Sequence, residues 1–170
     1  MKVTQTFGIT IVAIGCTAAL IDADQVRRQS GPAMVPIEIS LKIAAESYDA
    51  KGQGSCTHAP RASIYDVPSE MWTVRHEDGN RSMQLTLWKP SNGSTPMISM
   101  SVNGTNNLTI STVRGGQLSG SGTVTLAPTA RGGTFTVDAK SKAGEPVTGT
   151  IKCDAFTPAI AEGGDPYEQS

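Results

Sequence analysis

The sequence predicts an all-β domain, built as an antiparallel β-sandwich or a partly open barrel of about eight strands. Between residues 37 and 157, apolar residues alternate with polar ones in short runs, and turn sequences such as Asn103-Gly104 separate the runs. Alternation with a period of two is typical of strands that bury one face. The later runs recur at intervals of about 11 to 13 residues with no strong helical period between them, which is typical of antiparallel sandwiches and barrels.

The expected strands follow one another along the chain, each with one apolar phase. These phases cover residues 37–43, 72–76, 83–87, 98–102, 108–110, 124–126, 135–137 and 147–151. Because every second residue of a strand points to the same face, the apolar phases should face a common core. We expect Trp72 to be buried there, together with Val74, Leu85, Leu87, Ile98, Met100, Val102, Ile110, Val124, Phe135, Val137 and Ile151.

Three segments lack this alternation. Residues 54–70 contain two prolines and are expected to form the longest irregular loop, apart from a short strand at residues 62–65. Residues 16–36 are polar and charged, which indicates a tether, and the acidic, glycine-containing residues 158–170 predict a flexible tail. The β domain is therefore predicted at residues 37–157.

Composition excludes several classes of protein. The chain has 170 residues, of which 17% are charged and 38% hydrophobic, and this suits one domain with a modest core. Its formal net charge of −1 provides no basic surface for nucleic acid. Metal-ligand motifs such as His-x-His do not occur, and the sequence indicates neither a metal nor a cofactor.

Residues 1–15 have the pattern of a signal peptide. Lys2 precedes the apolar run 7–14, which suits a signal-peptide core and is too short to span a membrane. The Ala-Ile-Gly tripeptide at 13–15 is similar to a lipobox, after which Cys16 would be diacylated and become the new N-terminus.

This start resembles that of small bacterial cell-envelope lipoproteins, in which a polar tether joins the acylated Cys to a disulfide-closed β domain. The resemblance implies a location, in the periplasm or at the outer membrane with a lipid anchor, and no activity. Cleavage after Ala18, Ala19 or Ala23 is the alternative, since all three are small residues, and it would release a soluble secreted protein.

The cysteines predict one disulfide. Because Cys16 is either lipidated or removed, Cys56 and Cys153 remain as an even pair in an exported chain. Cys153 continues the alternation of Val147 and Ile151, so it should face the core. Neither cysteine belongs to a Cys-x-x-Cys motif, which argues against zinc.

Two histidines are the candidate general bases. His58 lies in the expected loop, and His76 ends a strand just before Glu77. No nucleophile motif accompanies either of them, so we expect structural imidazoles and no catalytic residue. A deep polar cleft that held either histidine together with Asp66, Glu70 or Glu77 would instead favour a small exported hydrolase.

Trp88 is the candidate surface anchor. It is in phase with Gln84 and Thr86, which point away from the phase of Leu85, so its indole should be partly exposed. Such an indole can stack on a glycan or anchor a protein partner. Trp88 and His58 are therefore the predicted binding surface.

Three functions agree with these observations. The first is a non-enzymatic cell-envelope domain that binds a partner or has a structural role, anchored through Cys16. The second is a small exported hydrolase that uses His58 or His76 with a nearby carboxylate. The third is a soluble secreted inhibitor or binding protein that presents residues 54–70. The missing nucleophile motif favours the first.

Overall fold

The computed structural model describes residues 32–104 and 107–159, and these form ten strands and no helix. The strands are β1 (Met34–Ile43), β2 (Glu46–Ile64), β3 (Val67–Asp78), β4 (Arg81–Pro90), β5 (Met97–Asn103), β6 (Leu108–Ser111), β7 (Ser121–Pro128), β8 (Gly133–Lys140), β9 (Pro146–Cys153) and β10 (Thr157–Pro158). Within these residues, no helix is long and apolar enough to cross a membrane.

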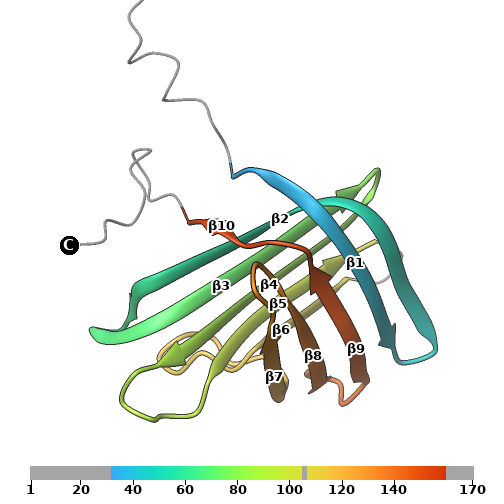
Figure 1. Ribbon diagram of the computed structural model, residues 1–170. Coiled ribbons are helices and arrows are strands. Elements are labelled where there is room, and N and C mark those ends of the chain that lie inside the picture. The colour runs from blue at the N-terminus through green and yellow to red at the C-terminus, as the bar shows by residue number, and fades with distance from the viewer. Residues whose placement is uncertain (1–31, 105–106, 160–170) are drawn as a thin grey trace, which may run out of the picture.

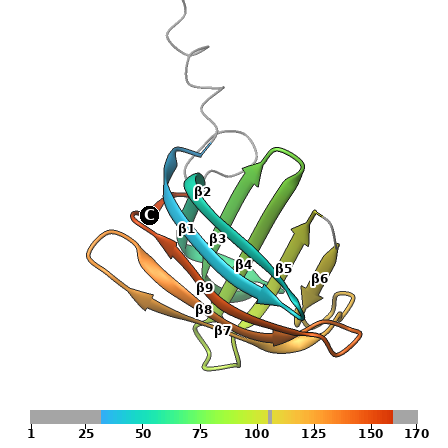
Figure 2. The ribbon, with the colours of Figure 1, turned by 90° about the vertical axis from the view of Figure 1, so that its right-hand side faces the viewer.

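Nine strands form one antiparallel sheet in the order β6-β5-β4-β3-β2-β1-β9-β8-β7. The sheet curls around so that β1, β9, β8 and β7 cross in front of β3, β4 and β5 (Figures 1 and 2). A bridge between Ser111 and Ser119 connects the β6 edge to the segment that precedes β7. The predicted partly open barrel is therefore confirmed: the sheet is nearly closed.

The core follows the predicted alternation. Along β1, for example, buried and exposed residues alternate from Met34 to Lys42. All eleven aliphatic and aromatic residues predicted from strand phase are buried, and Trp72 is buried with them, at 7% exposure. The apolar phase of each strand thus faces the inside of the barrel.

The prediction of an irregular loop at residues 54–70 was wrong. Residues 46–64 form β2, the longest strand, and β3 begins at Val67. The turn between them is tight, with Tyr65 and Asp66 at positive φ angles of 49° and 61°. The prolines do not prevent pairing, because a register shift between Ala59 and Ala62 leaves Pro60 out of the ladder. Residues 54–70 therefore do not form the exposed loop that the inhibitor hypothesis required.

Small residues explain why β2 was not recognised. Gly54 lies on the interior phase where an apolar side chain would be expected, and a Cβ there would lie 2.9 Å from Cγ2 of Ile37. Gly149 is similar, since it has a φ of 143° and a Cβ would collide with the Ser40 carbonyl. Close approach of neighbouring backbones therefore removes the hydrophobic alternation at these positions.

The described strands extend the predicted domain at both ends. β1 begins at Met34, within the segment expected as a tether, and β10 includes Pro158, within the segment expected as a tail. The signal peptide, Cys16 and residues 160–170 lie outside the described residues.

The predicted disulfide is confirmed. Cys56 on β2 bonds to Cys153 at the end of β9, over a sequence separation of 97 residues. Both cysteines are buried. The bridge spans β1, which lies between β2 and β9 in the sheet.

We expect loss of this disulfide to lower the free energy of unfolding by about 2–5 kcal/mol, because a crosslink over so long a loop restricts the unfolded chain. Urea unfolding of the oxidised protein, with and without reductant, measures the difference. A Cys56→Ala, Cys153→Ala double variant is the control, since reductant should leave its unfolding unchanged. An equal response of both proteins to reductant would contradict the prediction.

Candidate functional site

A cavity of about 640 Å³ lies at one end of the barrel, between the inner face of β2, β3 and β4 and the β7–β8 hairpin. Its lining residues are His58, Glu70, Trp72, Leu87, Lys89, Pro96, Val124, Thr125, Leu126, Pro128, Thr129, Ala130, Arg131, Gly132 and Phe156. Most of these side chains are apolar. Ligand sites commonly lie at the mouths of β-barrels and have volumes of about 300–1,000 Å³.

Unequal strand lengths create this cavity. The pairing of β1 with β2 ends at Met34 and Ser55, whereas β2 continues to Ile64 and β3 pairs with it there. β7 and β8 are shorter, with eight residues each. The β2–β3 hairpin therefore projects beyond the closed part of the barrel, and its inner face lines the cavity.

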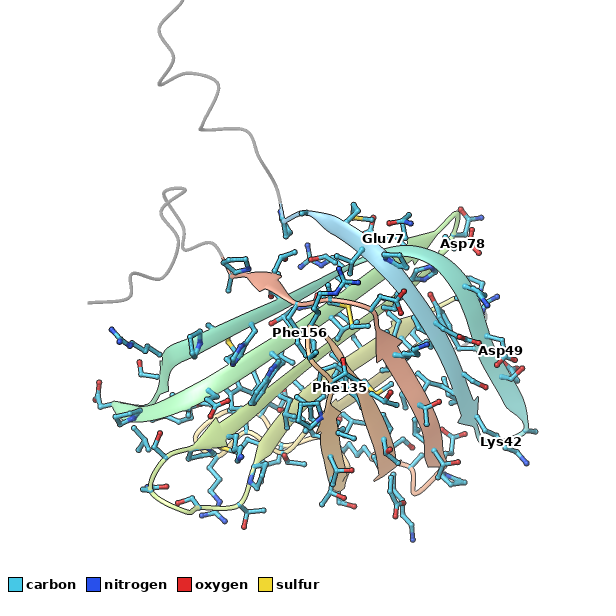
Figure 3. The ribbon with its side chains drawn as sticks, in the orientation of Figure 1. Lys42, Asp49, Glu77, Asp78, Phe135 and Phe156 are labelled. Carbon is cyan, nitrogen blue, oxygen red and sulfur yellow. A yellow bond between two sulfur atoms is a disulfide. The ribbon has the colours of Figure 1, made fainter. Side chains whose placement is uncertain are left out.

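Aromatic rings form the floor of the cavity. His58 and Trp72 are directly paired across β2 and β3, and their rings stack with centroids 4.7 Å apart and planes within 3°. Phe156 lies 6.3 Å from the His58 ring centroid and 5.9 Å from that of Phe135 (Figure 3). The floor is therefore an aromatic cluster that continues into the core.

His58 is held between this floor and a carboxylate. Its Nε2 atom lies 3.5 Å from Oε2 of Glu70, and both side chains are partly exposed. The geometry does not make a hydrogen bond: Nε2 is shielded from solvent and has no hydrogen-bond partner in the described chain. The imidazole thus retains one unused polar atom beside the cavity.

The segment after the disulfide completes the wall. The Phe156 amide donates a hydrogen bond to the Arg131 carbonyl at 2.7 Å, and the Ala159 amide donates to the His58 carbonyl at 3.1 Å. The Thr157 hydroxyl donates to the Cys56 carbonyl at 3.2 Å. These bonds place Phe156 against His58 and hold the β7–β8 turn at the mouth of the cavity.

The two residues predicted as one binding surface do not meet. His58 pairs with Trp72 on the inner face, whereas Trp88 is directly opposite Met71 and Met97 on the outer face. Trp88 is half-buried there. Its role as an anchor for a partner stays a prediction, but it does not line the cavity.

His76 is a structural residue at the opposite end of β3. It is 5% exposed, and its Nδ1 lies 3.1 Å from the Tyr48 hydroxyl. The Arg81 guanidinium covers the Tyr48 ring at 4.3 Å from the centroid. Glu77 and Asp78 follow at this end, toward the upper right of Figure 3. The cavity therefore brings only His58 together with a named carboxylate, Glu70.

Sequence reasoning missed most of the lining. Trp72 was assigned to the core because its side chain is on the apolar face of β3. The same face packs into the core at one end and lines the cavity at the other, so Trp72 belongs to both. Phe156 and Arg131 lie in connecting segments, where alternation gives no information. Lys89 offered one indication, since it continues the phase of Leu85 and Leu87 and therefore had to face inward.

Comparison with known protein families, with characterised protein sequences and with solved structures found no match.

Tyr48 should ionise only at unusually high pH. Burial raises its pKa above the ordinary value near 10, the charge of Arg81 opposes this shift, and Asp78 adds to it. The unfolded chain then loses this proton first, so the free energy of unfolding should fall as the pH rises from the unfolded pKa to the raised folded one. The tyrosinate absorbance of the wild type minus that of Tyr48→Phe measures the pKa, and a midpoint at or below 10 would refute the shift.

Proposed function

We propose that the protein is an exported, non-enzymatic binding protein that holds a small apolar or aromatic molecule in the mouth of its barrel. The observation that supports this is the cavity of about 640 Å³, which combines an aromatic floor with a small number of polar groups. Such a combination is typical of small-molecule sites, because the apolar walls supply affinity and the polar groups fix orientation.

Binding fits the cavity better than hydrolysis does. The cavity does contain His58 and Glu70, as the hydrolase hypothesis required, but its lining is mainly apolar rather than polar. In the described chain, no Ser, Thr or Cys side chain donates a hydrogen bond to the His58 ring, so no nucleophile is paired with this base. Ser55 is out of phase with His58, opposite Arg75 on the outer face.

Export and lipid anchoring at Cys16 belong to the same proposal. They rest on the signal-like residues 1–15 and the lipobox-like tripeptide before Cys16. The Cys56–Cys153 disulfide supports export, because such bonds persist in oxidising compartments. A lipid anchor would keep the binding domain at the cell envelope.

Filling the cavity should weaken binding. Phenylnaphthylamine, a neutral apolar dye, should bind the wild type with increased fluorescence, and Leu126→Trp should weaken binding by at least about tenfold because the indole occupies the ligand volume. Leu118→Trp is the matched control, since Leu118 is 61% exposed and does not line the cavity. Circular dichroism and thermal melting verify that both variants are folded. Equal dye binding by the two folded variants would refute this site, and no binding by the wild type would refute the proposed function.

Lipidation should depend on Cys16. The wild type, isolated from its native membrane, should partition into the detergent phase, and Cys16→Ala should remain in the aqueous phase because it lacks the thiol that carries the lipid. Mass measurement of the N-terminal peptide checks the acyl chains. Aqueous partitioning of both proteins would exclude the anchor and favour secretion after cleavage at Ala18, Ala19 or Ala23.

A further inference from the structure

The cavity has an apolar floor and a charged rim. Trp72 on β3 and Leu87 on β4 are direct partners in the floor. Two residues further along the same strands, Glu70 and Lys89 are the next partners on the same face. A step of two residues is about 7 Å along a strand, so the lining changes from apolar to charged over one side-chain layer. Arg131, in the β7–β8 turn, completes the rim.

The carboxylate on this rim faces the imidazole of His58 at 3.5 Å. Within the part of the chain that the structure describes, neither Lys89 nor Arg131 forms an ion pair with a carboxylate. Glu70 is directly opposite Lys89 in the pairing of β3 with β4, but its carboxylate contacts His58, so the described rim carries two cations against one carboxylate. This local excess of positive charge contrasts with the formal net charge of −1 of the whole chain.

We infer that the ligand is a small amphipathic acid, with its apolar or aromatic body on the floor and its carboxylate, sulfonate or phosphate group between Lys89 and Arg131. This inference rests on the proposed function of the cavity. A guanidinium and an ammonium are the side chains that bind such groups best, through charge-assisted hydrogen bonds.

The polar side chains of the site would orient the ligand with its acidic group at the rim. Lys89 and Arg131 are exposed, so they can meet the acidic group without the cost of burying unpaired charges. The Nε2 atom of His58 is shielded from solvent and faces Glu70, so the imidazole contributes to the site through its stacked ring. The Glu70 carboxylate contacts the His58 ring and therefore disfavours an acid placed on the β2 side.

Two dyes with the same apolar body separate this inference from the proposed function. Anilinonaphthalene sulfonate carries an acidic group, and phenylnaphthylamine does not. We expect the wild type to bind the sulfonate more tightly, by about tenfold, and expect raised salt to weaken only the sulfonate. Fluorescence titration gives both dissociation constants.

The variants Lys89→Gln and Arg131→Gln should each weaken sulfonate binding by about three- to tenfold and change the binding of the neutral dye by less than about twofold. Lys140→Gln and Arg114→Gln are matched controls, because they remove the same charges from exposed positions outside this cavity. Both control variants should bind both dyes as the wild type does.

The outcomes distinguish the two claims. Equal affinity of the wild type for both dyes, or equal loss of sulfonate binding in the rim variants and in the controls, would overturn the acidic ligand and leave the apolar site intact. Binding of neither dye would overturn the proposed function itself. Selective loss of the sulfonate in the rim variants would establish Lys89 and Arg131 as the groups that bind the acid.

Discussion

The Cys56–Cys153 disulfide is the constraint on which the candidate site depends. It joins Cys153, the last residue of β9, to Cys56 on β2, one residue beyond the last pair that β2 forms with β1. The chain that follows must therefore cross to β2, and it pairs there as β10, next to His58. This crossing brings Phe156 into the aromatic floor and, through the Arg131 carbonyl, fixes the β7–β8 turn. One covalent bond thus stabilises the fold and closes one wall of the cavity.

The cavity and the core are parts of one continuous inner face. Along β3, the inward residues change from the fully buried Val74 to Trp72 and then to the half-buried Glu70. The change occurs where β2 and β3 extend beyond the shorter strands that face them. At Val74 this inner face is covered by apolar side chains on all sides. At Trp72 and Glu70 one side is open, and it forms the cavity. The difference in strand length therefore turns the end of a core surface into the lining of a cavity.

Strand alternation predicted the core because the inward-facing residues are apolar wherever the two sides of the curled sheet pack against each other. It failed for β2, where Gly54 allows the close approach of Ile37 and the bulge around Pro60 interrupts the period. The disulfide could be predicted because only two cysteines remained for the domain. The cavity could not, because its walls come from four distant segments and its position depends on strand lengths and on the path of residues 154–156. None of these is encoded in local periodicity.

A histidine at position 58 is not required by the packing of the barrel. An aliphatic side chain would stack on Trp72 without leaving a polar atom unsatisfied, whereas Nε2 of His58 is buried without a hydrogen bond in the described chain. Glu70 and Lys89 also occupy the inward phase of β3 and β4, whose other polar members are His76, Asp78 and Arg81 at the opposite end of these strands. Departures from a local folding rule tend to gather at functional sites. Here Glu70 and Lys89 lie directly above the aromatic floor that contains His58, so these departures coincide with the mouth of the cavity.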